Sequence, residues 1–218
     1  MSENLADLFD AGAHDFQEWL GGLPAHREEF QRHFNEYEPV DDDRGRMERA
    51  IEFVGGSLRA LVVTDPTTSD DWRGVAVMAK VADIFGVDLS ILPAEGNEGV
   101  VDSRTNNYGE TGTPTIVFLD GSGTELGHLS GRPDQVEMDI NRAIEEEHGY
   151  DFPLEGPEFE AAVQVYLEGD GRKREPAWRH AQLWDTVGVV APVVQRISRG
   201  TIGPIGVLKP DAALARER

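Results

Sequence analysis

The order of apolar segments between residues 58 and 145 constrains the fold of this chain more than any other feature. Residues 58–64 and 87–92 are short runs rich in aliphatic and β-branched side chains, which is typical of buried strands. Between them, Val75, Met78 and Ala82 recur at the spacing of one helix face. Strand, helix and strand in this order predict a parallel βαβ unit with a right-handed crossover.

A second group of elements follows residue 112. Residues 115–119 and 124–129 are separated by Asp-Gly-Ser-Gly, a turn signal that predicts an antiparallel hairpin. Pro133 then opens a helix, because the first helical turn does not need the N–H that proline lacks. The sequence therefore predicts an α/β fold for the core, residues 57–148.

Apolar residues at helical spacing predict helices on both sides of this core. We divide the chain into an N-terminal helical region packed on the core, residues 1–56, the core itself, and a C-terminal helical extension with a basic segment, residues 149–218. An apolar stripe over residues 183–197 either covers the core or joins a dimer, and the sequence leaves the oligomeric state open.

The charge of the chain is extreme and uneven. The 218 residues carry a net charge of −21, and only three of the 20 basic residues are lysines. Many carboxylates with few lysines suit a halophilic protein, because molar salt screens their repulsion. A GC-rich genome, which favours arginine, is the alternative. From residue 172 onward there are nine basic and four acidic side chains, whereas the first 171 residues hold 11 and 37.

Several kinds of site and location have no support in the sequence. The N-terminal residues lack the basic and apolar regions of a signal peptide, and no apolar run approaches the roughly 18–20 residues of a membrane helix. The absence of cysteine excludes disulfides and cysteine-based metal centres. His26 and His33 lack a third ligand at metal spacing, and no nucleotide-binding loop occurs. We therefore expect an acidic cytoplasmic protein with no membrane association, metal or cofactor.

Residues 62–71, the helix through Ala82 and the segment Gly112-Thr113-Pro114-Thr115 before an apolar strand together resemble the thioredoxin family. The resemblance covers roughly residues 45–148 and implies a thioredoxin-like three-layer fold in which Pro114 is cis. It places Thr68 at the position of the nucleophilic cysteine, Asp71 at the resolving position and Asp70 at the turn aspartate of the family. Thiol–disulfide exchange needs a thiolate, so we expect this chain to be redox-inactive.

The resemblance also implies a groove that holds an extended protein segment by main-chain hydrogen bonds. Its residues in this chain are Thr67, Thr68, Ser69, Asp70, Asp71, Thr113 and Pro114. The hydroxyl side chains of Thr67, Thr68 and Ser69 have a simpler explanation as caps of a helix N-terminus. The backbone N–H groups at this helix N-terminus could instead hold an anion or a thiolate. The neighbouring carboxylates of Asp70 and Asp71 would repel either one. For Pro114, the alternative is an ordinary trans proline at the start of a strand.

A basic segment near residue 175 is the second candidate site. Basic and aromatic side chains alternate there, and the possible contacts for an anionic partner are Arg172, Lys173, Arg174, Trp178 and Arg179. Such residues can bind phosphates and stack on bases. We favour the alternative that this segment docks on the acidic part of its own chain or on a protein partner, because net charge alone does not select a partner.

Three functions remain open from these observations. The first, which we favour, is a redox-inactive thioredoxin-fold protein that binds other proteins through the cis-proline groove and has no enzymatic activity. The second is an enzyme, either a transferase or a reductase, that uses a thiol supplied by a cofactor or substrate at Thr68. The third is an adaptor that reaches nucleic acid or a ribosome through residues 172–199.

Overall fold

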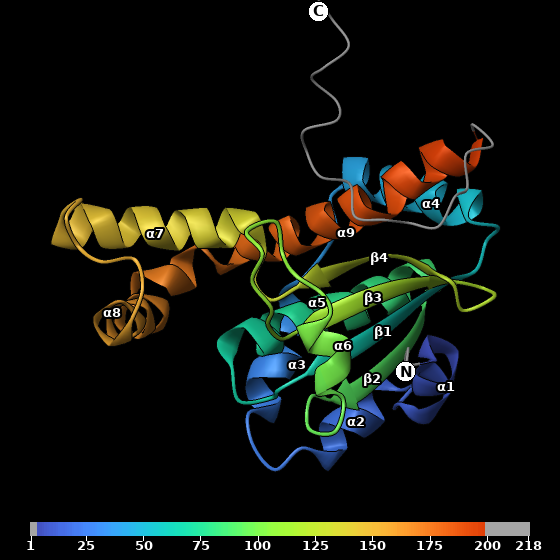
Figure 1. The fold of residues 1–218 in the computed structure, drawn as a ribbon, viewed down its shortest axis with the longest axis horizontal. Helices are drawn as coiled ribbons and strands as arrows, with labels where there is room; N and C mark the ends of the chain where they lie inside the picture. The colour runs from blue at the N-terminus through green and yellow to red at the C-terminus, as the bar shows by residue number, and fades with distance from the viewer. Residues whose placement is uncertain (1–3, 199–218) are drawn as a thin grey trace, which may run out of the picture.

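A four-stranded mixed sheet forms the centre of the protein. The computed structural model describes residues 4–198 and, within them, every side chain except those of Asp42, Asp43, Trp184 and residues 190–198. The strands are β1 (Leu58–Thr64), β2 (Asp88–Pro93), β3 (Thr115–Asp120) and β4 (Glu125–Ser130), in the order β2-β1-β3-β4 (Figure 1). The predicted strand positions are therefore confirmed to within one residue.

Strand directions agree with the βαβ unit and the hairpin expected from the sequence. β1 and β2 are parallel, and α5 (Ser69–Phe85) connects them. β3 runs antiparallel to β1, and β4 runs antiparallel to β3. Four helices precede the sheet: α1 (Leu5–Ala11), α2 (Phe16–Gly22), α3 (Arg27–Glu36) and α4 (Asp41–Phe53). These observations confirm the predicted α/β fold class.

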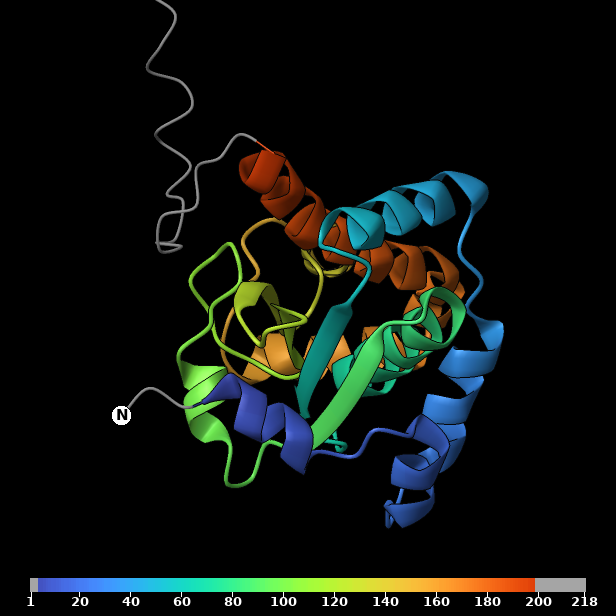
Figure 2. The ribbon, with the colours of Figure 1, turned by 90° about the vertical axis from the view of Figure 1, so that its right-hand side faces the viewer.

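The two faces of the sheet bury different clusters because side chains alternate along each strand. One face carries Ala60, Val62, Ile116 and Phe118, and packs against α2, α3, α4, α5 and the C-terminal helix α9 (Glu175–Ser198). The other face carries Leu61, Val63, Val117 and Leu119, and is covered by α1 and the short helix α6 (Glu98–Asp102). Figure 2 shows the sheet between these helix layers.

The helix after the hairpin leaves the sheet. α7 (Asp134–His148) and α8 (Pro157–Glu168) project from the main body and form a small lobe with the 3-10 turn η1 (Asp170–Lys173) and the start of α9 (Figure 1). Its core combines Ile140 and Val163 with Trp178. This lobe is held together by its own apolar cluster.

α9 returns from the lobe across β4. Leu183 and Val187 belong to the same apolar cluster as β1 and α5. The close approach of α9 requires glycine at position 127, because a Cβ there would lie 2.6 Å from Cγ1 of Val189. From residue 190 onward, the side chains of the predicted apolar stripe lie outside the described residues. The division into three regions stays a prediction.

The structure also bears on membrane association. Within residues 4–198, no helix has both the length and the apolar character needed to cross a bilayer.

Candidate functional site

The turn at the end of β1 holds the residues that the resemblance assigned to a redox site. Thr68 is the N-cap of α5, and its hydroxyl accepts a hydrogen bond of 3.2 Å from the backbone N–H of Asp71. Thr67 donates its hydroxyl to Asp65 at 2.8 Å. Thr68 therefore has the capping role that serines and threonines fill at helix starts.

Asp71 is the centre of this turn. Its carboxylate is fully buried and accepts hydrogen bonds from the hydroxyls of Thr64, Thr68 and Thr113 at 2.6, 2.5 and 2.8 Å. The backbone N–H of Asp65 donates a fourth bond at 3.0 Å. Burial raises the pKa of Asp71 to about 6, although each of these hydrogen bonds lowers it. The carboxylate joins β1, the helix start and the cis-proline loop.

The peptide bond between Thr113 and Pro114 is cis. The proline ring is buried against α5 at Gly74, where a Cβ would come within 2.5 Å of Cγ of Pro114. The side chain of Thr113 turns toward Asp71, whereas its backbone N–H and C=O form no hydrogen bond with any described residue. Thr113 therefore presents beside the turn one backbone donor and one backbone acceptor that no described residue pairs with.

Asp70 forms ion pairs rather than pointing into open solvent. Its carboxylate contacts the guanidinium of Arg73 at 2.5 Å and that of Arg132 at 2.8 Å. Arg132 also pairs with Glu137 at 2.9 Å. Burial alone would raise the pKa of Asp70, but Arg132 and Arg73 outweigh this effect and lower it. The aspartate is thus ionised and held by two arginines.

The basic segment that the sequence singled out packs on its own chain. Trp178 is 1% exposed and donates its indole N–H to Asp139 at 3.1 Å, while Arg73 lies 5.5 Å from its ring. Arg174 also pairs with Asp139, at 3.1 Å. Because the Trp178 ring is buried, a nucleic-acid base cannot stack on it.

The remaining basic residues differ in their surroundings. Arg179 is buried and pairs with Glu36 at 3.0 Å, and Lys173 pairs with Asp170 on the surface. Arg172 is exposed, and none of the described side chains pairs with it. Arg172 is therefore available to a ligand, and Lys173 and Arg174 are also exposed although each forms an ion pair.

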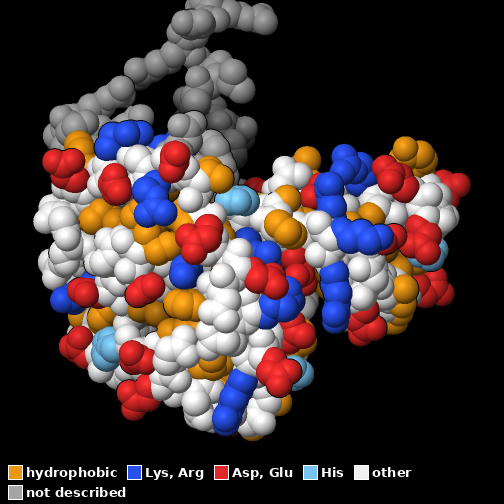
Figure 3. All heavy atoms as spheres, turned by 180° about the vertical axis from the view of Figure 1, so that it is seen from behind, with side chains coloured by type: hydrophobic (Ala, Val, Ile, Leu, Met, Phe, Trp, Pro, Cys, Tyr) orange, Lys and Arg blue, Asp and Glu red, His pale blue; other side chains and the backbone are white. Residues whose placement is uncertain are grey.

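A pocket of about 490 Å³, which we call the turn pocket, brings the two candidate sites together. Its walls come from the turn before α5, the cis-proline loop, α3, α8 and the start of α9. The candidate residues that line it are Thr67, Thr68, Ser69, Asp70, Thr113, Arg172 and Trp178. Asp71, Pro114, Lys173, Arg174 and Arg179 do not line it. In Figure 3, acidic and basic side chains gather where the main body meets the α7–α8 lobe.

The sequence did not predict the ion pairs on α3 and α9 that form one wall of this pocket. Arg32 on α3 forms an ion pair with Glu175 of α9 and another with Glu29 at 2.8 Å. His33 beside it is buried, and burial together with Arg32, Arg73 and Arg179 lowers its pKa to about 2. His33 is therefore neutral. No sequence signal links positions 33 and 179, because only the fold brings them together.

The other histidine considered for a metal site lies elsewhere. His26 stacks on Trp72, with ring centroids 4.6 Å apart, and Trp72 donates its indole N–H to the carbonyl of Pro66 at 2.9 Å. Among the described residues, no group of three His, Asp or Glu side chains could hold a metal ion.

Comparison with known proteins identifies the family. The family pattern described as Thioredoxin matches residues 13–145. A crystal structure of an HIV epitope scaffold is 22% identical, with a TM-score of 0.58 and coverage of 87% of this chain and 99% of its own. A crystal structure of a protein of unknown function from Pseudomonas aeruginosa is 20% identical, with a TM-score of 0.51 and coverage of 91% and 99%. These two likenesses show the fold alone, and no curated protein matches the chain. This chain, which has no cysteine, belongs to the thioredoxin family.

Proposed function

We propose that this protein is a redox-inactive member of the thioredoxin family that binds an extended segment of another protein. The segment lies in the turn pocket and pairs its main chain with Thr113. The observation that carries the proposal is that the backbone N–H and C=O of Thr113, which lines that pocket, have no hydrogen-bond partner within the part of the chain that the structure describes. Extended peptides bind to such edges through main-chain hydrogen bonds, whatever their side chains.

The chemistry of the turn supports binding rather than catalysis. The two positions that the resemblance assigns to redox cysteines hold Thr68 and Asp71, whose side chains are hydrogen-bonded to each other at 2.5 Å. Neither side chain can supply the thiolate that disulfide exchange needs. Ser69, in contrast, lines the pocket, and its hydroxyl makes no hydrogen bond with the described part of the chain. It is free to contact a bound segment.

The second hypothesis, a thiol-dependent enzyme, has less support. A thiolate held at Thr68 would lie beside the carboxylate of Asp71, which already accepts a hydrogen bond from the Thr68 hydroxyl. Like charges at this distance repel, and a buried setting strengthens the repulsion. The third hypothesis, a nucleic-acid adaptor, has exposed cations at residues 172–174, but Trp178, the aromatic side chain on which a base would stack, is buried, and so is Arg179.

We further propose that the protein works in the cytoplasm of an organism with high internal salt. The net charge of −21 on 218 residues supports this proposal, since self-repulsion of that size is relieved when salt screens the charges.

The binding proposal can be tested with a displayed library of unstructured peptides. We expect enriched peptides to bind the intact protein and to shift the NMR signal of the Thr113 amide. Ser69→Trp, which fills the turn pocket, should weaken binding by about tenfold, equivalent to roughly 1.4 kcal/mol. Glu95→Trp is the matched control, because Glu95 is exposed and lies outside the pocket. Equal binding by wild type and Ser69→Trp, or no enrichment over a mock selection, would overturn the proposal.

A further inference from the structure

Arg73 of α5 forms part of the wall of the turn pocket, although the residue is only 2% exposed. Its guanidinium lies over the ring of Trp178, and Nη2 donates a hydrogen bond of 2.5 Å to the carboxylate of Asp70. Nε is buried without a hydrogen-bond partner, and Nη1 forms no hydrogen bond with a described residue. A guanidinium has five N–H donors, and those on Nε and Nη1 of Arg73 therefore lack an acceptor.

The three arginines that are buried in the described part of the chain differ in this respect. Arg104 uses all of its side-chain nitrogens, because Nε and Nη2 donate to Glu125 and Nη1 donates to the carbonyl of Val100. Arg179 bonds through Nη1 alone, but it does not line the turn pocket. Arg73 is thus the buried arginine that brings unused donors to this pocket. A buried donor without an acceptor is rare, because its desolvation is uncompensated.

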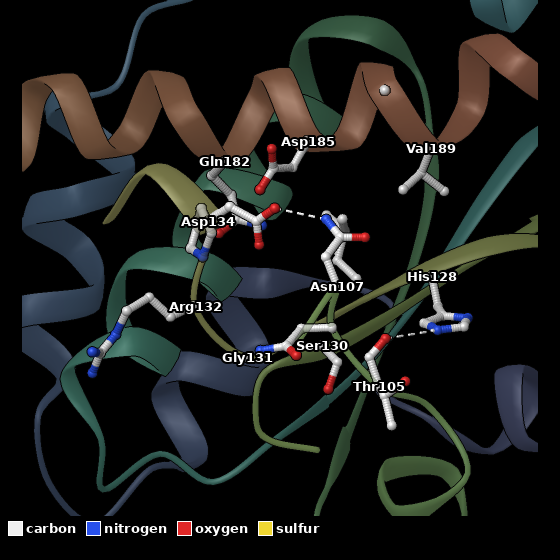
Figure 4. A pocket seen from close by; sticks show the side chains of 14 residues that line it. Thr105, Asn107, His128, Ser130, Gly131, Arg132, Asp134, Gln182, Asp185 and Val189 are labelled. Carbon is white, nitrogen blue, oxygen red and sulfur yellow. Dashed lines mark hydrogen bonds between the residues drawn. The ribbon is translucent and has the colours of Figure 1, made fainter. Parts of the chain in front are cut away.

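Arg132, which also lines the turn pocket, has an acceptor for each of its side-chain nitrogens. Nε and Nη2 donate to Asp70, and Nη1 donates to Glu137. Arg132 borders a second pocket as well, of about 320 Å³ beneath α9, but its guanidinium points away from Asp185 on the far wall of that pocket (Figure 4). The carboxylate of Asp70, which pairs with Arg73, is therefore shared with a second arginine.

The other charged groups of the turn pocket are either paired or exposed. Glu29 and Glu175 both form ion pairs with Arg32. Glu168 of α8 and Arg172 of η1 are exposed, and neither forms an ion pair with a described side chain. Exposed charges act weakly, because water and salt screen them. The group that this pocket lacks is therefore an acceptor for its buried guanidinium, and an anion fits that place best.

We propose that the turn pocket binds a carboxylate group of the extended segment, and that Arg73 is its main contact. The carboxylate accepts charge-assisted hydrogen bonds from the guanidinium nitrogens that no described residue occupies. Ser69 lies one helical turn before Arg73 on the same face of α5 and adds its hydroxyl, while Arg172 adds a second positive charge. The carboxylate belongs either to an acidic side chain or to the C-terminus of the segment. This inference rests on the proposed function, because its ligand is the segment that pairs with Thr113.

NMR titration of the intact ¹⁵N-labelled protein at fixed ionic strength tests the inference. N-acetyl-glycine carries a terminal carboxylate, N-acetyl-aspartate methylamide carries a side-chain carboxylate, and N-acetyl-glycinamide carries none. We expect both carboxylates to shift the Nε–H signal of Arg73 saturably, whereas the amide leaves it in place. The carboxylate that binds more tightly tells a C-terminus from an acidic side chain.

Three variants locate the site, with binding followed at the backbone amide signal of Ser69. Arg73→Lys keeps the positive charge but removes the guanidinium, and it should weaken carboxylate binding about tenfold. Arg172→Gln should weaken it about twofold, because an exposed charge contributes little. Arg49→Gln is the matched control and should bind like wild type, because Arg49 is exposed, lies outside the turn pocket and forms no ion pair with a described side chain. Arg172→Gln changes only an exposed side chain, so it keeps the test valid even where Arg73→Lys does not fold.

The inference is overturned when N-acetyl-glycinamide binds as tightly as N-acetyl-glycine, when neither carboxylate shifts the Arg73 signal, or when Arg73→Lys binds both carboxylates like wild type. A pool of peptides with amidated C-termini and no acidic side chains separates it from the proposed function. When this pool shifts the Thr113 amide signal as strongly as acidic peptides do, the groove stands and the carboxylate site falls. When the small carboxylates shift the Arg73 signal and no peptide shifts that of Thr113, the carboxylate site stands and the groove falls.

Discussion

The hydroxyl of Thr68 donates a hydrogen bond of 2.5 Å to the carboxylate of Asp71, and the backbone N–H of Asp71 donates one of 3.2 Å back to the same hydroxyl. The two residues hold the positions that the resemblance assigns to a redox pair. Their contact is a helix cap closed by a buried acid, which stabilises the turn but provides no nucleophile.

Asp71 should make stability depend on pH. Its pKa is raised in the folded protein, from 3.8 to about 6, so its contribution to stability is present below about pH 4 and is lost as pH rises through 6. In Asp71→Asn this loss is absent, because the amide does not titrate. Between pH 4 and pH 7, the free energy of unfolding of Asp71→Asn should therefore fall by about 3 kcal/mol less than that of wild type.

Urea unfolding at several pH values measures this effect. Asp185 also has a pKa raised to about 6, so Asp185→Asn is the matched comparison, and the double variant should show the weakest pH dependence. The same slope in Asp71→Asn and wild type would show that Asp71 is ionised at little cost in the folded protein.

Gly74 should be intolerant of a side chain, unlike Gly188 on α9. A Cβ at Gly74 would lie 2.5 Å from Cγ of Pro114, whereas at Gly188 it would meet nothing within 4 Å. We expect Gly74→Ala to be destabilising by about 1–3 kcal/mol through overpacking. Gly188→Ala should be stabilising by about 0.5–1 kcal/mol, because glycine is a poor helix former. Chemical unfolding of the two variants distinguishes them, and a stable Gly74→Ala protein would contradict the close packing of Pro114 on α5.

The strands and the site turn were predictable from the sequence because their signals are local. Apolar runs predict β1 and β3, and the hydroxyl residues before α5 predict a helix N-cap. The path of α9 was not predictable in this way. Its apolar stripe was compatible with a dimer interface as well as with packing on the core. Only the fold shows that Leu183 and Val187 pack into the main core cluster.

The α3 and α9 walls of the turn pocket could not be predicted for a related reason. The ion pair of Arg32 with Glu175 joins residues 143 positions apart, and the hydrogen bond of His33 with Arg179 spans 146. In the sequence, His33 was only an isolated histidine. No periodic pattern or turn signal reports a contact at such separations.

α9 should contribute strongly to global stability. Leu183 is fully buried in the cluster that includes β1 and α5. We expect Leu183→Ala to cost about 2–5 kcal/mol, the usual range for a large-to-small change in a core. Val165→Ala is the control, because Val165 on α8 is 69% exposed and should change stability by less than about 0.5 kcal/mol. A small effect at Leu183 would indicate that α9 is a separable extension.

The acidic surface should make the protein more stable in salt. At 0.1 M salt, charges interact over about 10 Å, whereas at 1 M this range falls to about 3 Å. With a net charge of −21, screening should relieve repulsion, and the melting temperature should rise steadily from low salt to molar KCl. Differential scanning fluorimetry measures this directly. A melting temperature that stays flat or falls would rule out adaptation to brine.

A single cysteine can report the electrostatics of the turn, because the natural chain has none. In Thr68→Cys the thiol would lie beside the carboxylate of Asp71 and at the N-terminus of α5, two influences of opposite sign on its pKa. We expect the carboxylate to dominate and to raise the thiol pKa above the ordinary value of about 8.5. Thr68→Cys/Asp71→Asn should lower it.

The pH dependence of alkylation by iodoacetamide gives both pKa values, with Glu95→Cys as an exposed reference. If Thr68→Cys has a pKa well below 8.5 while Asp71 is intact, the helix N-terminus outweighs the carboxylate. A thiolate would then be stable at this turn, and the enzyme that uses a thiol cofactor at Thr68 would become the better account of the site.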